Sequence, residues 1–223
     1  ARSRETREVV MRLVVEHDDP KALGMFAREI GSVGLGMAQG TASLIGGRPK
    51  PSPVVRLFTF FIPKHRLNPL QWQAGTDAPV AVHVPTQGGY AAPAPEAVEG
   101  RLAAGATVEV PLRSIAHSRS GDKGDTSNIA IYCRKPEYRD HVAAWLTPER
   151  VAAHFPGTVF GQVSVFDAPG LHAINFLMLE ALGGGGMASM RIDPHGKAYG
   201  QRLLEIMVPV PQEWVASGLS SGQ

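Results

Sequence analysis

The pattern of apolar and polar positions predicts a chain of mixed strands and helices. Near the start, the β-branched run at residues 8–15 predicts a strand. A helix is predicted next, because Asp19 can cap it with Pro20 at its first position, and its glycine stop begins at Gly31. A second apolar run between prolines, at residues 54–62, predicts another strand. Together these segments predict a β-α-loop-β unit.

A change in composition predicts where this unit ends. Proline, glycine, alanine and glutamine are frequent from residue 67 to 106, and only a short run at residues 79–84 is strand-like. We therefore expect four parts: the closing part of an α/β domain at 1–66, a connection at 67–106, a second domain at 107–212 and a tail at 213–223.

In the second domain, apolar runs with strand and helix periods alternate, which predicts an α+β fold of the ferredoxin-like, split β-α-β kind. The helix at residues 147–155 has Thr147 as its predicted N-cap. The predicted order is a strand from residue 107 that runs into a polar loop, a strand at 128–134, helices at 137–146 and 147–155, a strand at 159–169, a buried helix at 171–182, and a segment at 201–211 with a helical start and a strand-like end.

Composition narrows the function classes. Lys and Arg number 22 against 20 Asp and Glu, so no basic surface for nucleic acid is predicted. No apolar run approaches the roughly 20 residues that cross a bilayer. The charged first residues are unlike a signal peptide, and Cys133 is the single cysteine, so we expect a cytoplasmic protein without disulfides. The absence of an initiator Met leads us to expect a C-terminal portion of a longer protein.

The densest polar segment is residues 117–128, HSRSGDKGDTSN. Gly121 and Gly124 permit a positive φ, so their amides are expected to form an anion-binding nest beside the positive charges of Arg119 and Lys123. An equally weighted alternative is structural, with the polar side chains satisfying their own turn. The ligand-binding candidates here are Arg119, Ser120, Asp122, Lys123, Asp125 and Asn128.

Two other chemistries for this segment are weaker. Asp122, Asp125 and Asn128 offer oxygen ligands to a divalent metal, but their order is not that of an EF-hand, and we predict no metal site. Ser120 and Lys123 have the S-x-x-K spacing of some acyl-transfer enzymes, but that spacing works on a helix, whereas the glycines favour a loop.

A second candidate segment spans residues 183–197, where four glycines precede Arg191, Asp193, His195 and Lys197. It fits a binding loop, and it fits equally a tight turn made by Asp193 and its neighbours. Asn175 is polar within the predicted buried helix, and it either holds a nearby loop or touches a ligand. From this part of the chain, the candidates are Asn175, Arg191, Asp193 and Lys197.

Three motifs together resemble the C-terminal ferredoxin-like domain of the acyclic terpene utilisation (AtuA) family, across residues 107–210. They are RSGDKGDTSN at 119–128, the Asn-Phe pair at 175–176, and LGGG followed by S-x-R-x-D-x-x-GK at 182–197. Upstream, VVRLFTFFIPK is similar to the end of that family's larger N-terminal domain.

The resemblance implies a cytoplasmic protein of acyclic terpene (citronellol or geraniol) or related branched acyl-CoA catabolism, without implying a reaction. The expected ligand is an anionic CoA thioester or carboxylate, and segments 119–128 and 183–197 should then converge on one site. A non-catalytic assembly module is the alternative. The expected protein partners are the missing N-terminal domain or another subunit, and a homo-oligomer is expected.

Overall fold

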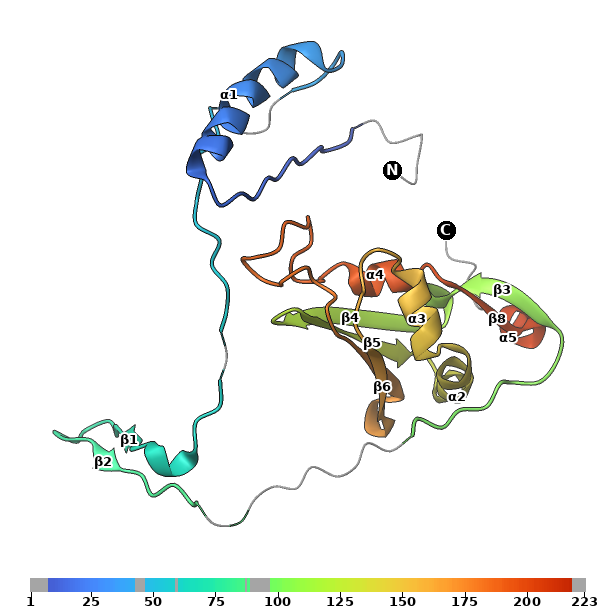
Figure 1. Cartoon of the computed structure of the whole chain (residues 1–223). Coiled ribbons are helices and arrows are strands. Elements are labelled where there is room, and N and C mark those ends of the chain that lie inside the picture. Colours follow the sequence, from blue (N-terminus) through green and yellow to red (C-terminus); the bar gives the residue numbers. More distant parts are fainter. Residues whose placement is uncertain (1–7, 43–46, 59, 87, 89–96, 218–223) are drawn as a thin grey trace. The chain divides into compact units, whose positions relative to one another are not determined.

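The computed structural model describes residues 8–42, 47–58, 60–86, 88 and 97–217 (Figure 1). Its contacts divide the chain into two compact units, one of residues 1–56 with 98–223 and one of residues 57–97. The small unit contains a 3-10 helix at Lys64–Arg66 and two short antiparallel strands, β1 (Leu70–Gln71) and β2 (Val80–Ala81). β2 lies within the strand-like run predicted at 79–84.

The predicted N-terminal helix is confirmed as α1 (Pro20–Gly36). The Asp19 side chain accepts a hydrogen bond from the Lys21 amide at 2.8 Å, which satisfies one free donor of the first turn. The helix continues past Gly31 to Gly36, so the predicted stop was too early.

The strands predicted at residues 8–15 and 54–62 were wrong for the described residues of both segments, which have no strand partner. A strand needs a neighbouring strand for its backbone hydrogen bonds, and apolar sequence does not supply one. The apolar side chains of both segments are exposed; Phe58 is 83% exposed and Phe61 is 100% exposed.

Four antiparallel strands form the main sheet, in the order β4-β5-β7-β6. β5 and β6 both pair antiparallel with β7, so they run parallel to each other with β7 between them. Helices α2 and α3 connect β5 to β6, which makes a split β-α-β unit and confirms the predicted α+β, ferredoxin-like class. The elements are β4 (Ala116–Lys123), β5 (Thr126–Cys133), α2 (Pro136–Trp145), α3 (Pro148–His154), β6 (Val163–Ala168) and β7 (Ala173–Met178).

A second, two-stranded sheet pairs β3 (Thr107–Pro111) with β8 (Met207–Pro211). β8 follows the short helix α4 (Tyr199–Leu203) and precedes α5 (Gln212–Ala216). Two 3-10 helices, at Leu112–Ser114 and Pro169–Leu171, complete the domain. The predicted helices at 137–146 and 147–155 are confirmed, and Thr147 caps the second by accepting a hydrogen bond from the Arg150 amide.

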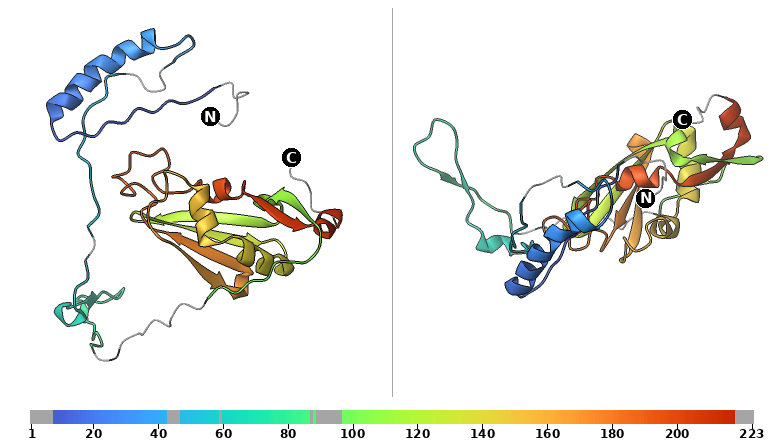
Figure 2. Two further views of the ribbon diagram at one scale, coloured as in Figure 1. Left: turned by 45° about the vertical axis from the view of Figure 1, so that its right-hand side comes forward. Right: turned by 90° about the horizontal axis from the view of Figure 1, so that it is seen from above.

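The core lies on one face of the main sheet. Ile129 of β5 is opposite Phe176 of β7, and both side chains are fully buried because α2, α3 and α4 pack over this face (Figure 2). The core is completed by side chains of these helices and of the residues that directly follow α2 and α3: Val142, Leu146, Val151, Phe155, Tyr199 and Leu203.

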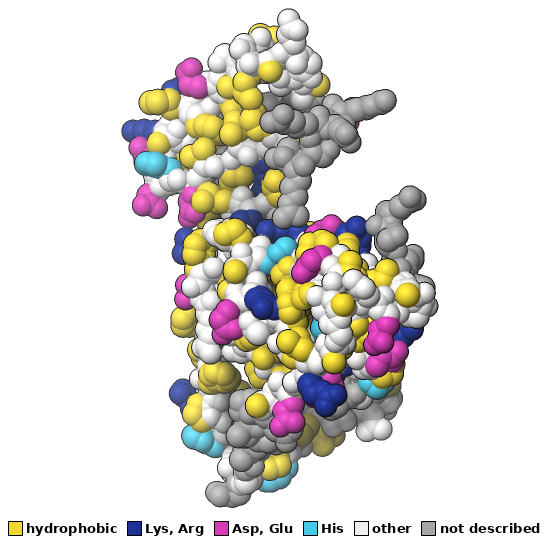
Figure 3. Space-filling model, turned by 90° about the vertical axis from the view of Figure 1, so that its right-hand side faces the viewer, with side chains coloured by type: hydrophobic (Ala, Val, Ile, Leu, Met, Phe, Trp, Pro, Cys, Tyr) yellow, Lys and Arg dark blue, Asp and Glu magenta, His cyan; other side chains and the backbone are white. Residues whose placement is uncertain are grey.

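The opposite face of the sheet, which we call the outer face, is more open. Successive strand residues point to opposite faces, so His117, Arg119 and Lys123 of β4 point outward. Side chains of the outer face are exposed or half-buried, except for Ala173. Figure 3 shows hydrophobic side chains interspersed with charged ones at the surface of the molecule.

Two predictions in the second domain were wrong. The helix expected at 171–182 is strand β7, so Asn175 lies in a strand. β7 is buried between two other strands, and a short apolar run of this kind does not distinguish a buried strand from a buried helix. The polar loop expected after the first strand is β4, which remains a strand to Lys123 because it pairs with β5 along its whole length.

Candidate functional site

The hairpin of β4 and β5 forms the centre of the candidate site. Gly124 has a φ of +61°, which glycine adopts readily at the first residue of a two-residue turn. Gly121, in contrast, is paired with Asn128 within the β4–β5 ladder. The predicted backbone nest was therefore wrong at Gly121, because its backbone belongs to the sheet.

The 183–197 segment lies against this hairpin. Asp125 Oδ1 accepts hydrogen bonds from the amides of Leu182 at 3.0 Å and Gly184 at 2.9 Å. A Cβ on Gly185 would lie only 2.0 Å from the carbonyl oxygen of Gly124, so the two backbones meet at a distance that only glycine permits. Asp125 thus fastens the glycine-rich loop to the turn.

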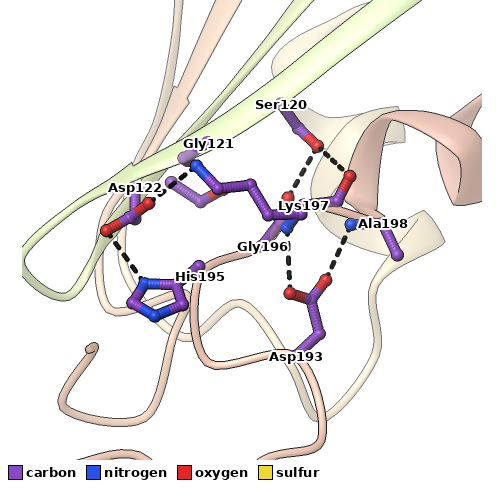
Figure 4. A network of polar contacts seen from close by, with 9 residues as sticks. Ser120, Gly121, Asp122, Asp193, His195, Gly196, Lys197 and Ala198 are labelled. Atoms are coloured by element: carbon purple, nitrogen blue, oxygen red, sulfur yellow. Dashed lines mark hydrogen bonds and ion pairs between the residues drawn. The ribbon is translucent and has the colours of Figure 1, made fainter. Parts of the chain in front are cut away.

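Ser120 lies on the helix-covered face of β4 and is buried. Its Oγ donates to the Gly196 carbonyl at 2.6 Å (Figure 4). It also accepts from the Gly200 amide at 2.9 Å, in the first turn of α4. Lys123 is three positions later on the strand and points to the outer face. A Ser120–Lys123 catalytic pair is therefore excluded by geometry.

Asp193 and Arg191 hold the loop by hydrogen bonds to its backbone. The two carboxylate oxygens of Asp193 accept from the amides of Lys197 at 2.9 Å and Ala198 at 2.8 Å (Figure 4). The Arg191 guanidinium donates to the Ala181 carbonyl and to the Tyr199 hydroxyl. The contacts of Asp193 fit the turn-forming role of the structural alternative, and Arg191 holds the backbone of the same loop.

Asp122 links two side chains of the same loop, those of Lys197 and His195. Its Oδ1 accepts from Lys197 Nζ at 3.0 Å, and its Oδ2 lies 3.2 Å from His195 Nδ1 (Figure 4). The hydrogen bond from Lys197, followed by that from His195, lowers the pKa of Asp122 below its ordinary value. His195 was absent from the predicted site; its signal was its position two residues before Lys197.

Lys197 also lies over Gly121. A Cβ built on Gly121 would lie 3.3 Å from Lys197 Nζ and 3.7 Å from Asn128 Oδ1. The missing side chain therefore leaves the space that the ammonium group occupies. Because β4 is an edge strand, Lys197 reaches this position from a loop that is fastened to the other face at Ser120.

Arg119 and Lys123 flank this position. Each is two residues from Gly121, so both point to the outer face, and both are exposed. Neither side chain makes a hydrogen bond or salt bridge in the part of the chain that the structure describes. We call Arg119, Lys123 and Lys197 the cationic edge.

Two side-chain amides lie beside the cationic edge on the outer face. Asn128 Nδ2 donates to Asn175 Oδ1 at 3.1 Å, and both side chains are half-buried. The ten predicted residues thus form two groups. Arg119, Lys123, Asn128, Asn175 and Lys197 lie at the outer face, whereas Ser120, Asp122, Asp125, Arg191 and Asp193 hold the loop.

Among the described residues, no group of three or more His, Cys, Asp or Glu side chains is arranged to hold a metal ion. Burial raises the pKa of the Cys133 thiol to about 11, and the positive charge of Arg139 opposes this rise only in part.

No helix in the described ranges has the length and apolar character needed to span a bilayer.

A family comparison agrees with the motifs that make up this site. The family model described as the AtuA ferredoxin-like domain matches residues 110–209, from the end of β3 to β8. The chain carries an AtuA ferredoxin-like domain. The match confirms the predicted resemblance to the C-terminal portion of the AtuA family. The AtuA domain includes the whole hairpin, the glycine-rich loop and the cationic edge. No curated protein and no solved structure gave a significant match to the chain.

Proposed function

We propose that this AtuA-type chain binds an anionic ligand, a CoA thioester or related carboxylate, at the cationic edge. The observation that carries the proposal is the position of Lys197 Nζ over Gly121, between Arg119 and Lys123. Lys197 is paired with the Asp122 carboxylate, whereas the side chains of Arg119 and Lys123 have no salt-bridge partner among the described residues. Exposed cations of this kind attract phosphate and carboxylate groups.

The amides of Asn128 and Asn175 support the same proposal. They lie beside the cations on the outer face. Because their side-chain hydrogen bond is with each other, a ligand can reach them without displacing a third residue. Arg119 adds a planar donor group that suits phosphate and carboxylate.

Binding is favoured over proton abstraction. A general base at neutral pH needs a raised carboxyl pKa, whereas the pKa of Asp122 is lowered by its hydrogen bond from Lys197. The role we assign to Asp122 is to hold Lys197 in place. We further propose a cytoplasmic role in acyclic terpene or related branched acyl-CoA catabolism, as the AtuA resemblance implies.

Isothermal titration calorimetry with CoA tests the proposal. The double variant Arg119→Ala/Lys123→Ala should bind CoA at least about tenfold more weakly, because loss of a charge-assisted contact costs about 1.5 kcal/mol or more. Lys135→Ala is the matched control. Lys135 is also an exposed cation, but it follows β5, at the opposite end of the sheet from the β4–β5 turn.

Binding of CoA by the wild type that is equally strong in the double variant would contradict the proposed site. No binding of CoA or of a carboxylate by the wild type would contradict the proposed function. Affinity should also fall as salt is added, because the contacts are exposed and screened.

A second candidate function is a non-catalytic assembly module. It is favoured by the exposed apolar side chains in segments 8–15 and 54–62, including Val9, Phe58 and Phe61. Exposed apolar stretches of this size are typical of protein interfaces. The partner we propose is an AtuA-type N-terminal domain or another copy of the chain, in a homo-oligomer. Light scattering after size-exclusion chromatography should then show assembly that Phe58→Ser/Phe61→Ser reduces.

A further inference from the structure

A group of exposed apolar side chains lies at one end of the main sheet. The exposed fractions are 69% for Phe160, 40% for Leu179, 78% for Met187, 51% for Met190 and 77% for Ile192. We call these five residues the apolar end. None of them was among the residues predicted from sequence to bind a ligand.

The strand register places the apolar end beside the β4–β5 turn. Ser127, Met178 and Val163 form one cross-strand row at the end of the sheet. Leu179 follows this row directly in β7, and Phe160 precedes it before β6. The Phe160 amide donates to the Glu180 carbonyl at 3.3 Å, which keeps the segment before β6 beside the segment after β7.

The loop that carries Met187, Met190 and Ile192 is fastened at the same end. It passes over Gly124 at Gly185, and the Arg191 guanidinium lies 6.0 Å from the centre of the Phe160 ring. The apolar side chains of this loop therefore belong to the same end of the sheet as Leu179 and Phe160.

The apolar end adjoins the cationic edge. Lys123 immediately precedes the turn that the loop covers, and Asn128 follows that turn by three residues. The three residues from the turn to Asn128 span about 10 Å of strand. One small molecule of about this length can therefore contact the apolar end and the cationic edge together.

We propose that the apolar end binds the acyl chain of the ligand whose anionic group binds at the cationic edge. This inference rests on the proposed function and adds the requirement that the ligand is an amphiphile with an aliphatic chain. Methionine suits this role, because its flexible, polarisable side chain adapts to apolar groups of varied shape.

A discrete amphiphile fits better than a membrane surface. Asn128, Asn175 and Arg119 lie on the face of the sheet, whereas Met187 and Ile192 lie at its end. A flat bilayer does not contact a face and an end that meet at an angle, but a flexible molecule can bend from one to the other. The exposed cations of the cationic edge match an anionic head group.

Calorimetric titration of the whole chain with CoA, acetyl-CoA and octanoyl-CoA tests the inference. Octanoyl-CoA should bind at least about tenfold more tightly than acetyl-CoA, since each fully buried methylene contributes about fourfold in affinity. The variant Met187→Ser/Met190→Ser should lose this gain and still bind CoA as the wild type does. Met207→Ser is the matched control, because Met207 is 47% exposed but lies in β8.

The outcomes separate the two proposals. Equal affinities for the three ligands would overturn the inference and leave the anion site in place. An octanoyl-CoA preference that survives in the double Met variant would also overturn it, because the chain would then bind elsewhere. If none of the three ligands binds, the inference fails, and the proposed function fails with it when a free carboxylate such as octanoate does not bind either. Binding of vesicles of phosphatidylglycerol without binding of octanoyl-CoA would replace the inference with membrane attachment.

Discussion

The ammonium nitrogen of Lys197 lies 3.0 Å from Asp122 Oδ1 and over the backbone of Gly121, in space that any side chain at that position would narrow. Asp122 holds the Lys197 ammonium group by a hydrogen bond, and Gly121 has no side chain that would crowd this group. Arg119 and Lys123 then extend the positive surface in both directions along β4. This relationship explains why glycine, aspartate and lysine occur together in the two motifs.

Substitution of Gly121 by Ala should weaken ligand binding without unfolding the domain. The new Cβ would lie 3.3 Å from Lys197 Nζ, which is the far end of a flexible side chain and is able to move away. We expect CoA affinity to fall several-fold and the melting temperature to change little. Gly170→Ala is the control, since a Cβ at Gly170 meets nothing within 4 Å. A Gly121→Ala variant that binds CoA as well as the wild type would show that the position of Lys197 is irrelevant.

The stability of the domain at acid pH should depend on Asp122. The hydrogen bond from Lys197 lowers the pKa of Asp122 in the folded state below its ordinary value of 3.8. Its contribution is therefore complete above about pH 4 and is lost as the pH falls through the folded pKa. Denaturant unfolding at pH 6 and pH 3 should show a smaller loss of stability for Asp122→Asn than for the wild type. The difference should be under about 1 kcal/mol, because the pair is partly exposed. Equal losses would contradict the pairing.

Ser118 and Ser120 provide a matched pair on the same face of β4. Ser120→Ala should reduce the free energy of unfolding by about 1–3 kcal/mol, because it removes the partner of the Gly196 carbonyl and the Gly200 amide. Ser118→Ala should be neutral or slightly stabilising, because Ser118 Oγ is buried without a hydrogen-bond partner. Urea denaturation measures both changes. Similar values for the two variants would contradict the role of Ser120 in holding the loop.

Cys133 should react slowly in the folded protein. Its pKa of about 11, against an ordinary value of 9.0, lowers the reactive thiolate fraction about 100-fold at pH 8. Ellman's reagent should therefore label the native protein far more slowly than the urea-unfolded protein. Comparable rates would show that the thiol is not held in an apolar environment.

Local patterns in the sequence predicted much of the fold. The Asp19 and Thr147 caps and the helices they begin follow from neighbouring residues, and the structure confirms them. β7 was mistaken for a helix because its burial comes from strands distant in sequence. The strands expected at 8–15 and 54–62 failed for the same reason, since pairing depends on a partner that the apolar pattern does not specify.

The candidate site shows a similar limit. The sequence singled out both segments, but it did not separate residues that hold the loop from residues that face outward. That separation depends on the alternation of β4, which places Ser120 inside and Arg119 outside. It also depends on the reach of Lys197 around an edge strand, a contact between residues 75 positions apart. His195, whose partner Asp122 is 73 positions away, was not among the predicted site residues.

Nuclear magnetic resonance titration of the isotope-labelled chain with CoA tests the central claim most directly. Binding at the cationic edge predicts the largest chemical-shift changes at the backbone amides of Arg119 to Lys123, at the side-chain amides of Asn128 and Asn175, and at Lys197. Changes confined to residues elsewhere in the chain, or no changes at saturating CoA, would contradict it.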